Sequence, residues 1–165
     1  MKKLILVSAV IFSLSALNVN AAKNTEVYDY ERASELGTAA FKNKSYDNAF
    51  KHLDKASRLG NKAAQYTLAL LYMGGQGVKQ DYTQAYLWLN VAAEVKHNKW
   101  RGLRDKIHNA LSEEQRNVLQ PLVQEHINKF GAKAQEVSCS KRSAVGSNIR
   151  VMRCVKQLNP EEMRL

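Results

Sequence analysis

Apolar positions between residues 31 and 130 recur with the period of an α-helix. Proline is almost absent from this stretch, and glycine interrupts the pattern at Gly60, at residues 74–77 and at Gly131. Glycines placed between periodic segments are typical of turns. The pattern therefore predicts several helices joined by tight connections.

The helical pattern also repeats itself. Residues 46–56 read Tyr-Asp-x-Ala-Phe-x-x-Leu-x-x-Ala, and residues 82–92 read Tyr-Thr-x-Ala-Tyr-x-x-Leu-x-x-Ala, at an offset of 36 residues. Upstream the offset is 32, so the second copy carries four extra residues in the glycine loop 74–77. Each copy predicts a helix, a turn and a second helix. Such pairs stack because one pair cannot bury its own apolar face.

The second copy carries a fixed set of residues in one register: Tyr72, Gly75, Gly77, Asp81, Ala85, Trp88, Ala92 and Ala93. This set resembles the signature of the Sel-one-like repeat (SLR), a relative of the tetratricopeptide repeat. The first copy lacks the glycine loop and is a degenerate match. The resemblance implies an all-α fold, a short right-handed α-solenoid of antiparallel helix pairs, with repeats at about 30–61 and 62–97.

The glycine loop has a mechanical explanation. Gly75 and Gly77 can adopt positive φ, which short connections between antiparallel helices often require. Asp81 stands where it can cap the next helix. A phosphate-binding loop is the alternative, but no Gly-Lys-Ser/Thr follows and the flanking segments are helical.

Two further helices are expected after the repeats, as a capping pair over about residues 98–130. Residues 98–110 predict a basic helix with Trp100, Leu103 and Ile107 on one face. Residues 112–115 (Ser-Glu-Glu-Gln) predict a capping box and a helix that runs to Phe130. Pro121 lies inside this helix and should bend it or split it in two. The helical-repeat domain is thus expected at residues 22–131.

The C-terminal tail, residues 132–165, changes character. Its middle alternates like a strand, and Cys139 and Cys154 are placed symmetrically about Gly146-Ser147. A type II′ turn at those two residues would set the cysteines opposite each other on a small β-hairpin. A disulfide between them would stabilise the fold by about 3 kcal/mol. The Gly-Ser-x-Ile core between two cysteines also resembles a tail of small exported bacterial proteins, and residues 159–162 predict a last short helix.

The N-terminus has the pattern of a secretory signal peptide at residues 1–21. Lys2 and Lys3 precede a 14-residue apolar run, and Val19-Asn20-Ala21 follows as a cleavage pattern. The run is shorter than the ~20 residues that span a bilayer, so no membrane span is expected in the mature chain. We expect a periplasmic protein, with release outside the cell as the alternative.

Positive charge is concentrated in two places. The whole chain carries +10, and loss of Lys2 and Lys3 would leave +8. Residues 96–106 hold five basic residues and one acidic residue, and residues 132–165 hold seven and three. Such asymmetry can attract an anionic partner, although a solvated surface is an equal interpretation. The candidate anion-binding residues are Lys99, Arg101, Arg104, Lys141, Arg142, Arg150 and Arg153.

No catalytic constellation is recognised in the sequence, and no cofactor is expected. Glu94 and His97 have the spacing of a helical metal pair, but a di-metal site in a helical bundle needs two such pairs with additional carboxylates. Some exported cysteine-rich relatives of the SLR family are linked to β-lactams. Those relatives carry a disulfide in each repeat, which this chain lacks.

The resemblance therefore favours an interaction module that binds an envelope protein or peptide. Tyr66 and Tyr86 are the candidate partner-binding residues, because the inner surface of a solenoid is its usual binding face. A structural role in the core is the alternative for each, and it is the favoured one, because most aromatic residues of such repeats are buried. The alternatives are a binder of an anionic cell-wall component and an enzyme directed at cell-wall material or β-lactams. Nucleic acid is not expected as a partner, since no recognition motif is present.

Overall fold

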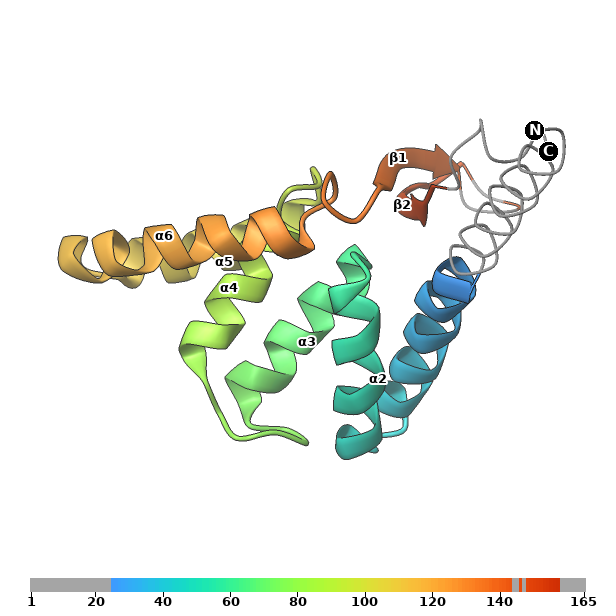
Figure 1. Cartoon of the computed structure of the whole chain (residues 1–165), viewed down its shortest axis with the longest axis horizontal. Helices are drawn as coiled ribbons and strands as arrows, with labels where there is room; N and C mark the ends of the chain where they lie inside the picture. The colour runs from blue at the N-terminus through green and yellow to red at the C-terminus, as the bar shows by residue number, and fades with distance from the viewer. Residues whose placement is uncertain (1–24, 144–145, 147, 158–165) are drawn as a thin grey trace, which may run out of the picture.

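A computed structural model describes residues 25–143, 146 and 148–157 (Figure 1). A first helix covers residues 25–42. It is followed by α2 (Tyr46–Arg58), α3 (Lys62–Gly74), α4 (Tyr82–Ala92), α5 (Asn98–Ala110) and α6 (Glu113–Phe130), and then by strands β1 (Val137–Ser143) and β2 (Arg150–Lys156). The expected fold class, a helical repeat with a capping pair and a C-terminal hairpin, is confirmed. The expected signal peptide and last short helix lie outside the described residues.

Small residues bring the repeat helices together. Ala49 and Ala56 of α2 and Ala85 and Ala92 of α4 have no exposed surface. Without bulky side chains at these positions the helix axes can approach closely, and large apolar residues fill the space between pairs. Trp88 of α4 is the largest of these and is 2% exposed. Figure 1 shows the first helix, α2, α3 and α4 side by side, with α5 and α6 across one end.

The glycine loop connects α3 to α4 in the conformation that the sequence predicts. Gly75 ends α3 at φ 62°, and Gly77 follows at φ 68°. A Cβ atom at Gly77 would lie 2.2 Å from the carbonyl oxygen of Tyr46, so the loop passes against the start of α2. Asp81 then caps α4 by accepting a hydrogen bond from the amide of Gln84 at 2.9 Å. Each signature residue of this connection, namely Gly75, Gly77 and Asp81, therefore has a structural role.

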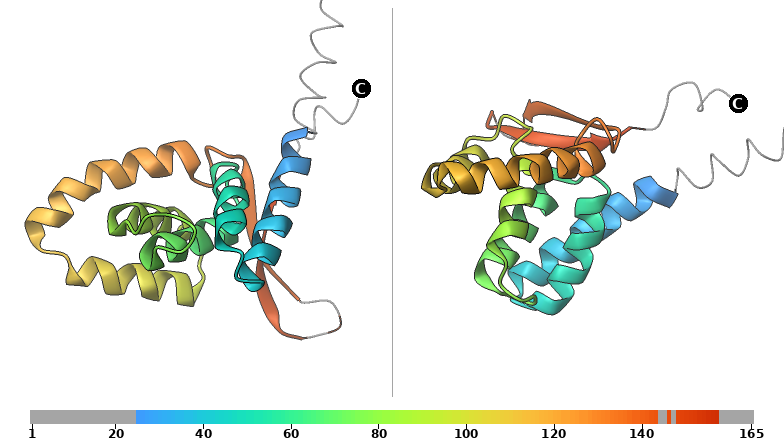
Figure 2. Two further views of the ribbon diagram at one scale, coloured as in Figure 1. Left: turned by 90° about the horizontal axis from the view of Figure 1, so that it is seen from below. Right: turned by 60° about the vertical axis from the view of Figure 1, so that its left-hand side comes forward.

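The capping helices lie across α4. Ser112 and Gln115 form the expected capping box at the start of α6. The helix then continues through Pro121, so the predicted split does not occur, and α6 curves along its length (Figure 2). Pro121 is exposed, and water can therefore bond the carbonyl group that its missing N–H leaves free.

The C-terminal strands pair as an antiparallel hairpin in the predicted register. Cys139 faces Cys154, and the two form a disulfide. Pairing ends at Ser143 and Arg150, so the connection is longer than two residues. Gly146 has the expected positive φ, at 72°. Ala144, Val145 and Ser147 lie outside the described residues, so the predicted type of turn is not tested.

The hairpin is docked on the repeats. The Tyr30 hydroxyl of the first helix donates a hydrogen bond to the Cys154 carbonyl oxygen at 3.2 Å. Lys156 has a side chain only 5% exposed, and its ammonium group pairs with Glu26 at 2.7 Å and donates to the Leu59 carbonyl oxygen at 3.3 Å. Val137 is buried against Gly60, where a Cβ atom would lie 2.8 Å from the valine side chain. Contacts between segments that are distant in the sequence therefore fix the hairpin to the first repeat.

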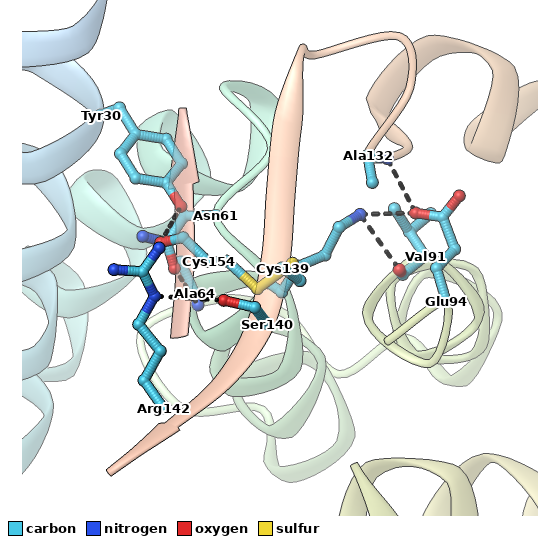
Figure 3. Close-up of a disulfide and its surroundings, with 11 residues drawn as sticks. Tyr30, Asn61, Ala64, Val91, Glu94, Ala132, Cys139, Ser140, Arg142 and Cys154 are labelled. Atoms are coloured by element: carbon cyan, nitrogen blue, oxygen red, sulfur yellow. Dashed lines mark hydrogen bonds and ion pairs between the residues drawn. A yellow bond between two sulfur atoms is a disulfide. The ribbon is translucent and has the colours of Figure 1, made fainter. Parts of the chain in front are cut away.

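A second lysine is enclosed where α3, α4 and the end of α6 meet. The Lys62 side chain has no exposed surface, and its ammonium group donates to the Val91 carbonyl oxygen at 3.2 Å and to Glu94 Oε2 at 2.6 Å. The same Glu94 oxygen accepts the amide of Ala132 at 2.9 Å (Figure 3). Burial lowers the pKa of Lys62, against the opposing effect of Glu94. We call Lys62, Val91, Glu94 and Ala132 the lysine node.

The lysine node predicts that Lys62→Met destabilises the protein by about 1–3 kcal/mol, because Glu94 and the Val91 carbonyl lose their charged donor. The unfolded chain holds the lysine proton up to a pKa near 10.5, and the folded chain releases it earlier. This ionisation therefore makes the folded state more stable as the pH rises towards 10.5. In urea unfolding over this range, the free energy of unfolding of the wild type relative to that of Lys62→Met should rise with pH. If the free energy of unfolding depends on pH equally in both proteins, Lys62 is not the group whose titration changes the stability.

The docked hairpin predicts the opposite pH dependence for Tyr30. Burial, with a smaller effect of Glu31, raises the pKa of Tyr30 to about 12 from 10.0. Below pH 10 the variant Tyr30→Phe should be less stable by about 1 kcal/mol, since it loses the hydrogen bond to Cys154. Between pH 10 and 12 only the unfolded wild type releases this proton, so the wild type loses that advantage as the pH rises. Urea unfolding at about pH 9 and about pH 11 tests this. If the difference in unfolding free energy between the wild type and Tyr30→Phe is the same at both values, the raised pKa of Tyr30 is refuted.

Candidate functional site

Two hollows formed by the described residues could receive a partner. The first, which we call the end hollow, has a volume of about 550 Å³ and lies between α4, α5 and α6. It is lined by Tyr82, Thr83, Tyr86, Ile107, Leu111, Glu114, Gln115, Val118 and Leu119. Figure 1 shows that the α5–α6 pair extends beyond α4, and on the α4 side the hollow is lined by residues of the N-terminal half of that helix.

The lining of the end hollow is mostly apolar and partly open. Tyr82 and Val118 are each 63% exposed, and both line this one hollow. Glu114 and Gln115 supply the polar groups at its rim, in the first turn of α6. This arrangement suits the apolar side chains of a peptide or protein, with Glu114 available to accept a hydrogen bond.

The structure buries both tyrosines that the sequence singles out. Tyr66 is 9% exposed and stacks on Trp100, with ring centres 5.5 Å apart, and burial raises its pKa. Its ring therefore packs under α5 instead of lining an open face. Tyr86 is 5% exposed, and its hydroxyl is hydrogen-bonded to Nδ1 of His108 at 2.8 Å. Tyr86 nevertheless borders the end hollow and forms part of its inner wall.

The second hollow, the hairpin groove, also has a volume of about 550 Å³. It lies between β1 and the connection from α4 to α5, and is lined by Glu94, Val95, Lys96, Ala132, Cys139, Ser140, Lys141 and Met152. Two of these side chains are cationic. The carboxylate of Glu94 is held by Lys62 and by the Ala132 amide, so its charge is balanced within the lysine node.

The candidate anion-binding residues fall into two groups. On α5, Lys99 is exposed, Arg101 donates to the Ala93 carbonyl oxygen at 3.2 Å, and Arg104 pairs with Asp105 at 2.6 Å. Contacts within the fold therefore occupy part of the hydrogen-bonding capacity of the two arginines. On the hairpin, the strands carry Lys141, Arg142, Arg150 and Arg153, all of them exposed. The hairpin is therefore the more available basic surface.

Metal-ligating side chains do not gather among the described residues. These residues contain no group of three or more His, Cys, Asp or Glu placed to hold a metal ion. Glu94 of the candidate metal pair serves the lysine node, and the His97 ring stacks on Trp100 at 4.3 Å. No helix in this part of the chain is both long and apolar enough to cross a membrane.

Sequence reasoning missed both hollows, although one signal of the end hollow is visible in the sequence. Residues 118–123 of α6 contain two adjacent apolar pairs, Val118-Leu119 and Leu122-Val123. Such pairs make an apolar stripe wider than one packing face needs. The structure buries Val123, whereas Val118 and Leu122 remain exposed. The hairpin groove had no such signal, because it depends on contacts between distant segments.

Comparisons with known proteins agree with this architecture. Residues 30–61 and 62–97 each match the Sel1 repeat. The chain is also similar to the crystal structure of a protective antigen present in uropathogenic Escherichia coli strains, described as displaying an SLR fold. The TM-score is 0.55 and the identity 28%, over 70% of this chain and 25% of that chain. This chain therefore corresponds to about a quarter of the antigen's length. A search of curated proteins finds no match, and neither similarity indicates a catalytic family. Residues 30–97 of this chain are two Sel1 repeats, and the fold is an SLR fold that ends in a disulfide-closed hairpin.

Proposed function

We propose that this protein is an exported interaction module of the bacterial cell envelope, and that a partner protein binds in the end hollow. The observation that carries the proposal is the open apolar corner beside the second repeat, where Tyr82 and Val118 are exposed. An apolar hollow with a few polar groups at its rim is typical of a binding site. The Sel1 repeats support a protein partner, since stacked helical repeats are a binding scaffold.

Two features support export. The first is the signal-peptide pattern of residues 1–21. The second is the Cys139–Cys154 disulfide, which leaves no free cysteine among the described residues. Disulfides persist mainly in oxidising compartments such as the periplasm. The proposal therefore places the protein in the periplasm, where its partner would be another envelope protein.

Crosslinking from within the end hollow tests this proposal. A photoreactive amino acid would replace Val118 or Tyr82 in the native bacterium, and Thr38, exposed on the first helix, would serve as the control position. We expect the same protein adduct from Val118 and Tyr82 and none from Thr38. Adding Val118→Glu to the Tyr82 crosslinker chain should reduce the adduct at least about tenfold, because a charge would enter an apolar contact.

Three results would contradict the proposal. They are equal adducts from all three positions, no protein adduct from the hollow, and retention of the tagged chain with the cytoplasmic fraction. The enzymatic alternative has its own test, which is turnover of a chromogenic β-lactam by the purified mature protein. Turnover would replace the interaction module with an enzyme.

A further inference from the structure

β1 has an outer edge that no other strand of the described chain covers. The sheet has two strands, and β2 lies between β1 and the first helix (Figure 3). The edge of β2 is engaged by the first helix, through Tyr30 and the Cys154 carbonyl oxygen. The edge of β1 faces the hairpin groove on the side of Glu94 and Ala132.

Main-chain groups of β1 point out along this edge. The Val137 amide donates outside the sheet, to the Ala132 carbonyl oxygen at 2.8 Å. Alternate residues of an antiparallel strand direct their N–H and C=O groups to the same side, so Cys139 and Lys141 point the same way as Val137. The outward Cys154 carbonyl oxygen agrees, because Cys154 is the partner of Cys139 in the register. Apart from the ladder, no hydrogen bond of the described residues uses the main chain of Cys139 or Lys141.

The charge of the hairpin selects what can pair with this edge. Residues 137–157 contain five basic residues and no acidic residue. Lys156 forms an ion pair with Glu26, and the other four basic residues are exposed. A second copy of the hairpin would bring like charges together, which disfavours edge-to-edge pairing. An acidic strand would instead be attracted, with Lys141 and Lys96 on the two walls of the groove.

The groove has room for the side chains of such a strand. Its volume of about 550 Å³ is walled by Val95 and Met152 as well as by the lysines. Side chains of an added strand alternate between the two faces of the sheet. One set would enter the groove beside Lys96 and Lys141, and the other would lie over the outer face of the hairpin.

We infer that the free edge of β1 is a docking site for an extended, acidic segment of a partner protein, which adds a third strand to the hairpin. Peptide recognition by strand addition combines main-chain hydrogen bonds with pockets for alternate side chains. A polyanion would satisfy the lysines, but it offers only acceptors and would leave the outward N–H and C=O groups of β1 incompletely paired. The edge geometry therefore favours a peptide. This site is separate from the end hollow, and either assignment can fail alone.

Fluorescence anisotropy with the mature, oxidised protein tests the inference. The probe is a labelled peptide of alternating Glu and Val residues. Its matched control has the same sequence with alternate amides N-methylated, which keeps the charge and removes hydrogen-bond donors on one edge. We expect the plain peptide to bind and the methylated peptide to bind at least about tenfold more weakly, since it loses two or more main-chain hydrogen bonds. Binding should weaken as salt is added.

Paired protein variants separate charge from main-chain pairing. Lys141→Gln removes the charge alone, and Lys141→Pro also removes the outward N–H without touching the ladder. The proline variant should bind at least about fivefold more weakly than the glutamine variant. Lys51→Gln, a change of an exposed lysine on α2, and Val118→Glu in the end hollow should leave binding unchanged. Circular dichroism and intact disulfide would verify folding.

Other results would overturn the inference. Equal affinity for the plain and methylated peptides, or equal binding by the two Lys141 variants, would show that charge alone attracts the peptide. Inorganic polyphosphate that binds more tightly than the plain peptide would assign the hairpin to polyanions. No binding of the plain peptide up to millimolar concentration would remove the site.

Discussion

The ammonium group of Lys62 has no exposed surface, and the arrangement of the molecule depends on the oxygens that surround it. A buried cation is stable only where it is paired and hydrogen-bonded. Here one partner is the Val91 carbonyl oxygen near the C-terminal end of α4, whose other hydrogen bond is a long one from the Glu94 amide, at 3.4 Å. The other partner is Glu94, which also holds the Ala132 amide. One buried charge thus joins the two helices of the second repeat to the chain that leads into the hairpin.

Gln65, which also lies on α3, holds main-chain carbonyl groups as Lys62 does. Its side-chain amide donates to the carbonyl oxygens of Ser57 and Phe130, both at 2.9 Å. These acceptors are at the ends of α2 and α6, so two polar side chains of α3 fix the ends of three other elements. The end hollow and the hairpin groove both follow from this arrangement. The first exists because α6 is held across α4, and the second because β1 starts from a fixed point beside Glu94.

Local and periodic features of the fold could be predicted from the sequence. The glycine loop, the cap at Asp81, the capping box at Ser112 and the register of Cys139 with Cys154 each depend on residues that are close in sequence or symmetric about a turn. The long-range contacts could not be predicted. Lys62 has the sequence context of a solvated residue at the start of a helix. Nothing in the sequence near Tyr30 or Lys156 indicates that the first helix contacts β2. Tyr66 and Tyr86 are candidates in the sequence because the inner surface of a solenoid is its usual binding face. Packing against α5 buries both of them, as the structural alternative requires.

The lysine node fixes the start of the hairpin to the repeats, and amide hydrogen exchange tests this attachment. In the folded protein the amides of Ala132 and Val137 are both hydrogen-bonded, to Glu94 and to the Ala132 carbonyl. In Lys62→Met their exchange should accelerate by about tenfold more than that of amides within α2, because the hairpin would open locally while the repeat stays folded. Equal acceleration at all of these amides would show only global destabilisation. That result would contradict a specific role for Lys62 in holding the hairpin.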